Sequence, residues 1–146
     1  MQALGQWDPS DYAFKPTWSL DGQWIAYYDT PQRSMNAEIY VIRIDGTGAR
    51  NLTINEAIDW SPSWSPDNRY LAFVSSRDGN SEIYRMDTTC LQTEQDVRSC
   101  RDTTRRLTWN RVSDVSPSWS ADSSQIIFVS EVGGRTTLYA MNADGS

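Results

Sequence analysis

Short apolar stretches alternate with polar turns along the whole chain. Three of them, QWIAYYD at 23–29, RYLAFVS at 69–75 and QIIFVSE at 125–131, are rich in aromatic and β-branched residues. Such stretches, bounded by turn residues, are typical of buried strands. No segment shows the apolar spacing of three to four residues that indicates an amphipathic helix. The pattern therefore predicts an all-β protein.

Each of these stretches follows one recurring phrase. The phrase reads PTWSLD at 16–21, PSWSPD at 62–67 and PSWSAD at 117–122, so its copies are 46 and 55 residues apart. The closing Asp and the Gly, Asn or Ser after it have the chemistry of a tight turn between two strands. The phrase is expected to form a first strand and the turn into a second.

Two further strands follow in the repeat. A third strand is predicted in AEIYVIRI, SEIYRMD and TTLYAMN, which place Tyr40, Tyr84 and Tyr139 at matching positions. RNLT at 50–53 and RRLT at 105–108 supply a short fourth strand. A repeat of about 45 residues with four antiparallel strands matches one blade of a β-propeller.

The wording of the repeat also resembles a known family. PSWSPD, LAFVSSRDGNSEIY and RRLT, in this order, resemble the TolB-type repeat, a WD-related propeller family found in bacterial periplasmic TolB and in exported or peptidase-associated proteins. The resemblance runs from about Lys15 to the end of the chain. It implies a six-bladed ring and a docking role in the cell envelope.

The repeat divides the chain into four parts. Residues 1–14 are expected to form an outer strand and a lead-in, 15–61 blade one, 62–116 blade two, and 117–146 a third blade without its outer strand. Two copies that exchange N-terminal strands would close a six-bladed ring with two-fold symmetry, which makes a homo-oligomer the expected state. A fragment of a longer propeller, or a filament built by pairing of edge strands, are the alternatives.

The amino-acid composition excludes several kinds of catalytic site and disfavours some partners. The chain has no histidine, which excludes Ser-His-Asp and Cys-His catalysis and His-based zinc sites within it. The net charge is −6 and the 13 basic residues are scattered, so nucleic acid is not an expected partner. No apolar run reaches the roughly 18 residues of a membrane span.

Both cysteines lie in one insertion of blade two. Residues 88–104, between its third and fourth strands, are expected to form an extended hairpin with Cys90 and Cys100 at its base. A disulfide there would stabilise the fold by about 2–3 kcal/mol and favours an oxidising compartment, periplasmic or extracellular. Free structural thiols are the alternative, because two Cys without His fall short of a metal site.

Binding residues are expected on the loops that enter each first strand. Asp59 and Asp114 both precede their tryptophan by five residues, and Trp60 and Arg111 lie in the same loops. Together they would bind a protein or peptide, or Ca²⁺ in the central channel, whose oxygen ligands the carboxylates could supply. The structural alternative is that each Asp accepts hydrogen bonds that fix its turn.

The residues thus favour a binding or assembly module without catalysis, and no metal or cofactor is assigned. One alternative is the propeller domain of a larger exported enzyme, an oligopeptidase or a metal-dependent lyase. The other is the structural subunit of a filament.

Overall fold

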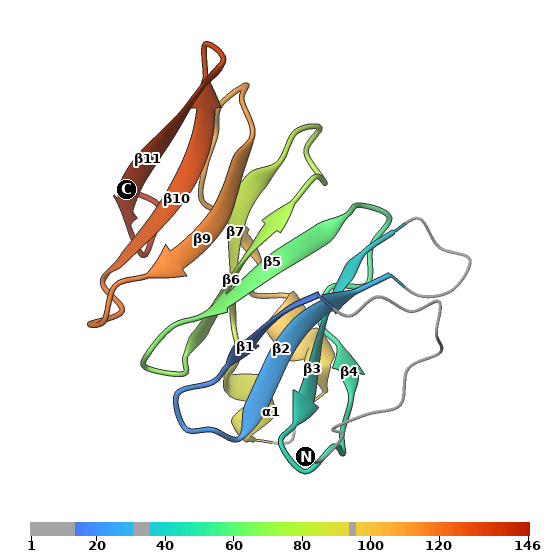
Figure 1. The fold of residues 1–146 in the computed structure, drawn as a ribbon. Coiled ribbons are helices and arrows are strands. Elements are labelled where there is room, and N and C mark those ends of the chain that lie inside the picture. The colour runs from blue at the N-terminus through green and yellow to red at the C-terminus, as the bar shows by residue number, and fades with distance from the viewer. Residues whose placement is uncertain (1–13, 31–35, 94–95) are drawn as a thin grey trace.

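The computed structural model describes residues 14–30, 36–93 and 96–146. Its strands form three antiparallel sheets that fan out side by side (Figure 1). Blade one contains β1 (Phe14–Trp18), β2 (Trp24–Asp29), β3 (Glu38–Arg43) and β4 (Arg50–Asn51). Blade two contains β5 (Asp59–Trp64), β6 (Tyr70–Ser75), β7 (Glu82–Asp87) and β8 (Arg105–Arg106). Blade three contains β9 (Asp114–Trp119), β10 (Gln125–Val132) and β11 (Arg135–Asn142).

This architecture confirms the predicted all-β propeller with three blades in the chain. Each sheet is a meander in chain order, and blade three ends at β11 in the described residues. The outer strand predicted within 1–14 lies almost entirely outside the described residues. Neither described helix is long and apolar enough to cross a bilayer.

The recurring phrase builds the first turn of every blade through its serine and aspartate. Ser19 Oγ donates to Asp21 Oδ1 at 2.6 Å, and the same carboxylate oxygen accepts from the backbone N–H of Gln23 at 3.0 Å. Blades two and three repeat both bonds around Asp67 and Asp122. The three aspartates therefore fix turns, as Asx turns do.

The core lies between the blades. Leu71 and Phe73 of blade two pack in one cluster with Trp24 and Ile39 of blade one. The alternating residues of the same strand, such as Val74, pack in a second cluster with residues of blade three. Strand β6 thus buries both of its faces, which is why its stretch reads as a continuous apolar run.

Tryptophans of the recurring phrase pack at the contacts between neighbouring blades. Trp64 is buried against blade one. Trp119 stacks on Tyr70 of blade two, with ring centroids 6.2 Å apart, and donates from Nε1 to the carbonyl of Ser63 at 3.0 Å. Trp18, at the same repeat position in blade one, is 56% exposed.

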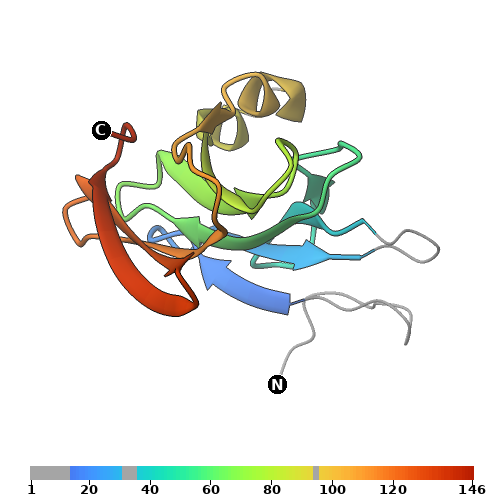
Figure 2. The same ribbon diagram turned by 90° about the horizontal axis from the view of Figure 1, so that it is seen from above.

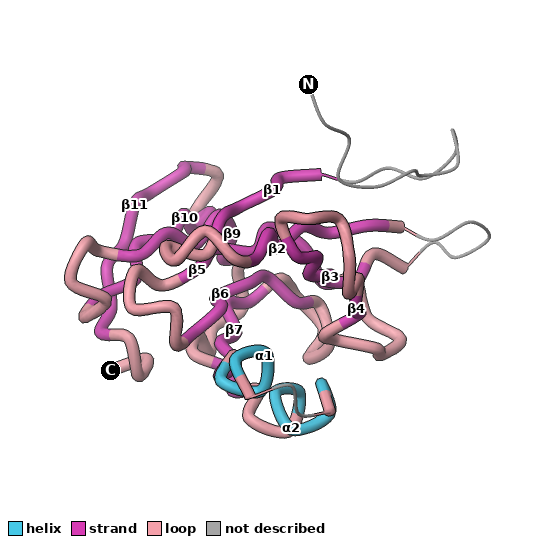
Figure 3. Tube along the Cα trace, turned by 90° about the horizontal axis from the view of Figure 1, so that it is seen from below, coloured by secondary structure: helices cyan, strands magenta, loops and turns pink. Residues whose placement is uncertain are grey.

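The cysteine insertion differs from the predicted hairpin. It forms two short helices, α1 (Thr89–Gln92) and α2 (Val97–Arg101), on the side of the molecule opposite β1 (Figures 2 and 3). Cys90 and Cys100 are disulfide-bonded, with Cα atoms 5.6 Å apart, as predicted. Both cysteines are buried in the core between blades one and two, so tertiary packing favours helical turns here.

Candidate channel-facing binding site

Every first strand contains a bulge at the residue before proline. Register shifts interrupt the pairing of β1, β5 and β9 with their neighbours at this point. Lys15, Ser61 and Ser116 occupy the bulges with φ of 47°, 53° and 58°. Proline has no N–H to continue the ladder, and a bulge turns the affected side chain in a new direction. The bulges therefore change the direction of the side chains of Lys15, Ser61 and Ser116 on the innermost strands β1, β5 and β9.

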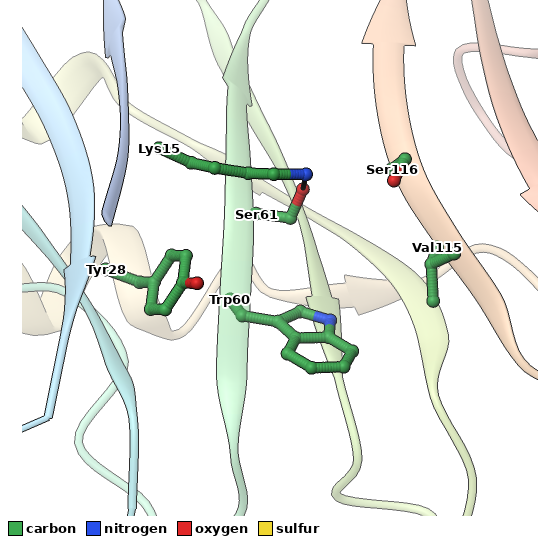
Figure 4. A pocket seen from close by; sticks show the side chains of 6 residues that line it. All are labelled: Lys15, Tyr28, Trp60, Ser61, Val115 and Ser116. Atoms are coloured by element: carbon green, nitrogen blue, oxygen red, sulfur yellow. Dashed lines mark hydrogen bonds between the residues drawn. The ribbon is translucent and has the colours of Figure 1, made fainter. Parts of the chain in front are cut away.

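A pocket of about 290 Å³ opens on this surface. We call it the channel-facing pocket, because the innermost strands of a closed propeller would line its central channel. Its lining comes from three inner strands and from β2, and consists of Lys15, Tyr28, Trp60, Ser61, Val115 and Ser116. The Lys15 side chain reaches from β1 across to β5, where Nζ donates to Ser61 Oγ at 3.3 Å (Figure 4). The rings of Tyr28 and Trp60 lie below this bond (Figure 4).

The pocket combines an apolar wall with few polar groups. Trp60 Nε1 is buried without a hydrogen-bond partner in the described part of the chain. A buried donor without a partner costs free energy, which a ligand oxygen could recover. Concave apolar sites with a few directed polar groups are the usual form of ligand-binding sites. The arrangement can bind an apolar or aromatic group that carries an acceptor.

The predicted acidic residues lie elsewhere than expected. Asp59 and Asp114 are completely buried at the starts of β5 and β9. Asp59 accepts from Asn55 Nδ2 and pairs with Arg77, whose Nη2 lies 3.1 Å from Oδ2. Asp114 accepts from Asn110 Nδ2 at 2.6 Å. This geometry agrees with the structural alternative, in which each carboxylate fixes its loop, and not with a ring of exposed carboxylates.

The four predicted binding residues are only partly brought together. Trp60 lines the pocket, and Asp59 precedes it in β5. Arg111 is exposed in the loop before β9, and neither Arg111 nor Asp114 lines the pocket. In the described residues, no three His, Cys, Asp or Glu side chains cluster closely enough to hold a metal ion.

Two buried glutamates hold the loops that enter β5 and β9. Glu38 accepts from Thr53 Oγ1, and from the backbone N–H of Asn55 at 3.0 Å. Burial raises the pKa of Glu38 above its ordinary value, although the bonds from Thr53 and Asn55 lower it in part. The carboxylate therefore anchors the loop that leads to Trp60.

Glu82 does the same for the loop before β9. It accepts from Thr108 Oγ1, from the backbone N–H of Asn110 at 3.3 Å, and from Arg106 Nη2 at 2.8 Å. Blade one has Asn51 at the position of Arg106. A buried glutamate thus fixes each of the two loops, and this preorganises the pocket between the inner strands.

Sequence reasoning missed most of the pocket. Its signal was present in the residue before the proline of each phrase, Lys15, Ser61 and Ser116, which supplies half of the lining. Tyr28 carried no such signal, because its place in the pocket depends on how two blades meet.

A family model for the TolB β-propeller domain matches residues 8–97, which is more than half of the chain. The chain belongs to the TolB β-propeller family. A TolB homologue from Chlorobium luteolum is 37% identical over 78 residues, a match that covers 53% of this TolB-type chain and 17% of the relative.

Solved structures share the fold. A candidate TolB from Agrobacterium tumefaciens superposes with a TM-score of 0.76 at 25% identity, covering 92% of this chain and 47% of that one. The acylaminoacyl peptidase of Pyrococcus horikoshii, at 18% identity and a TM-score of 0.62, shares the fold over 92% of this chain and 23% of its own. The TolB-type chain thus spans less than half the length of these relatives.

Proposed function

We propose that this TolB-type chain is a non-catalytic module that binds a protein or peptide through its channel-facing pocket. The observation that carries the proposal is the pocket itself, where Trp60 presents an apolar ring and a buried N–H without a partner. A partner side chain that fills the pocket would bury apolar surface and accept this hydrogen bond. Tryptophans in such pockets are frequent binding hot spots.

The rest of the ring would come from a second copy or from a longer chain. Leu138, on the outward face of blade three, is 66% exposed, and no described strand pairs with the free edge of β11. Two copies that exchange N-terminal strands would cover these surfaces and give a homo-oligomer of six blades. Light scattering would show a species of twice 16.6 kDa in that case, and a series of larger particles if the edges join copies into a filament.

The expected compartment is periplasmic or extracellular. The disulfide between Cys90 and Cys100 is buried, and such bonds persist in oxidising compartments. The match to the TolB β-propeller family supports the same placement, because the family resemblance implies a role in the cell envelope.

A second candidate is the propeller domain of a larger exported enzyme. Its support is the shared fold with acylaminoacyl peptidase, of which this chain would represent only a part. Such an enzyme would carry its catalytic residues outside this chain, because the chain has no histidine.

The test of pocket binding uses peptides selected against this chain from a random library. Substitution Trp60→Ala should weaken the binding of the selected peptides by about tenfold or more, as expected of a hot spot. Trp109→Ala is the matched control, since Trp109 is 75% exposed and lies outside the pocket lining. Equal affinity for the wild type and Trp60→Ala, with both proteins folded, would contradict the proposed site.

A further inference from the structure

A second cleft, of about 310 Å³, lies in blade two where β6 begins and β7 ends. Three arginines line it together with one acid, one aromatic residue and one threonine: Arg69, Arg85, Arg105, Asp87, Tyr70 and Thr103. The channel-facing pocket is remote along β6, because Trp60 pairs with Val74 near the other end of this strand. A concentration of positive charge is unusual in a chain with a net charge of −6.

Two of the arginines face each other directly. Arg85 on β7 pairs with Arg105 on β8 in the antiparallel register. Like charges at directly opposite positions destabilise a sheet. In blade one the same pair consists of Val41 and Arg50, so the fold itself does not require an arginine on the third strand.

Arg85 is held in place for binding. Its Nη1 donates to the carbonyl of Ala143 at 2.7 Å, and its guanidinium lies 4.1 Å from the ring centroid of Tyr70. A guanidinium has five N–H donors, of which this bond uses one. The group is thus oriented, and most of its donors remain for a ligand.

Asp87, the acid in the cleft, does not neutralise the charges of Arg85 and Arg105. Asp87 lies 3.6 Å from Arg69, and its Oδ1 accepts from the backbone N–H of Thr89 at 2.8 Å. Burial alone would raise the pKa of Asp87, but the bonds from Thr89 and the charge of Arg69 lower it, so this acid is ionised and balances Arg69. Asp144, which is exposed in the last turn near Arg85, accepts two bonds from Ser146.

We propose that this cleft is an oxyanion-binding site, in which Arg85 and Arg105 together bind a carboxylate or phosphate group. Arginine pairs suit this chemistry because planar guanidinium groups donate parallel hydrogen bonds to two oxygens. A bound anion would also remove the repulsion between the two strands. The site is separate from the channel-facing pocket and does not depend on the peptide binding proposed there.

The first experiment titrates the ¹⁵N-labelled chain with inorganic phosphate at constant ionic strength, with sodium chloride as the balancing salt. Saturable shifts of the amides of Arg85 and Arg105 are expected. Arg105→Gln should weaken the apparent affinity by about tenfold, because charge-assisted hydrogen bonds are lost. Arg105 is exposed, so this variant is expected to fold even if Arg85→Gln does not.

The matched control is Arg135→Gln, which makes the same charge change at an exposed position of the β10–β11 hairpin. A second probe, a blocked triglutamate peptide, distinguishes the source of the anion. Binding of phosphate that Arg105→Gln weakens supports a phosphate group, and binding of only the peptide with the same sensitivity supports a carboxylate. Saturable binding of neither probe, or equal weakening by Arg135→Gln, would overturn the proposal. Binding that persists in Trp60→Ala separates this site from the proposed function.

Discussion

Blades two and three are built from the same repeat but differ in what covers them. Phe73 and Tyr84 stack with centroids 5.9 Å apart, and Phe128 and Tyr139 repeat this stack at 5.8 Å. Yet Tyr84 is 3% exposed and Tyr139 is 42% exposed. The internal geometry of a blade therefore comes from its own sequence, whereas burial of its faces comes from its neighbours.

The two blades also differ in their polar interior. Glu82 of blade two is buried and accepts hydrogen bonds from Arg106 in β8 and from the loop that follows it, while its counterpart in blade three is the exposed Thr137. The buried carboxylate lies where two consecutive blades share a loop. The repeat thus uses buried charge to fix a loop that leads into the next blade.

The largest expected effect comes from Glu82→Ala. This change leaves the mostly buried Arg106 without its closest acidic partner, 2.8 Å away, and should lower the free energy of unfolding by about 3–5 kcal/mol. Thr137→Ala should change it by less than about 0.5 kcal/mol. Urea denaturation of both variants tests the difference, and a loss below about 1 kcal/mol for Glu82→Ala would count against the role of the ion pair.

The next effect compares two aliphatic residues at one repeat position. Ile83→Ala should cost about 2–5 kcal/mol, because Ile83 is fully buried and its removal leaves a cavity. Leu138→Ala should cost less than about 0.5 kcal/mol in the monomer, where Leu138 is largely exposed. If Leu138→Ala destabilises the protein as much as Ile83→Ala, blade three is already covered in solution. Dependence of that loss on protein concentration would then identify a second copy as the cover.

The disulfide lies in blade two and has no counterpart in blade three, so its removal tests a further difference between the two blades. Replacing Cys90 and Cys100 with serine should lower the free energy of unfolding by about 2–3 kcal/mol, since the closed loop is short. Thermal unfolding with and without reductant measures this loss in the wild type. The serine variant, which has no disulfide to reduce, serves as the control, and a melting temperature insensitive to reductant in the wild type would contradict the expectation.

The smallest effect concerns the first turn of blade three. The hydroxyl of Ser120, and then the hydroxyl and N–H of Ser124, donate to Asp122 and lower its pKa from 3.8 to about 2. A carboxyl with a lowered pKa in the folded state adds stability above its unfolded pKa, and this contribution is lost as the pH falls through about 2. NMR titration of the Asp122 carboxyl measures the value. A midpoint near 3.8 would show that these hydrogen bonds are absent in solution, and Ser120→Ala should raise the midpoint.

The strands and turns of the repeat could be predicted from the sequence, but the contacts between the blades could not. The strands and the turns at Asp21, Asp67 and Asp122 follow from local patterns that recur. The helices at the cysteines were missed because they are short, and their burial against another blade stabilises them. A local sequence pattern carries no information about packing against a surface that is far away in the sequence.

The candidate site was predictable only in part for the same reason. Trp60 was identified from its place before the tryptophan of the phrase, although it lies in β5 and not in a loop. The burial of Asp59 depends on Arg77, 18 residues away. Glu82 and Thr108 are separated by 26 residues. Networks that join distant segments cannot be derived from spacing alone.

The disulfide-linked helices have a mechanical consequence. They extend from the outer edge of blade two, yet Arg101 in α2 donates from Nε to the carbonyl of Leu52 in blade one at 3.3 Å. The pair of helices therefore acts as a brace between two sheets that otherwise meet only through side chains and loops. A force that slides blade one past blade two would act on this hydrogen bond and on the apolar packing of the helices, and the disulfide would keep the two helices together while that force is applied.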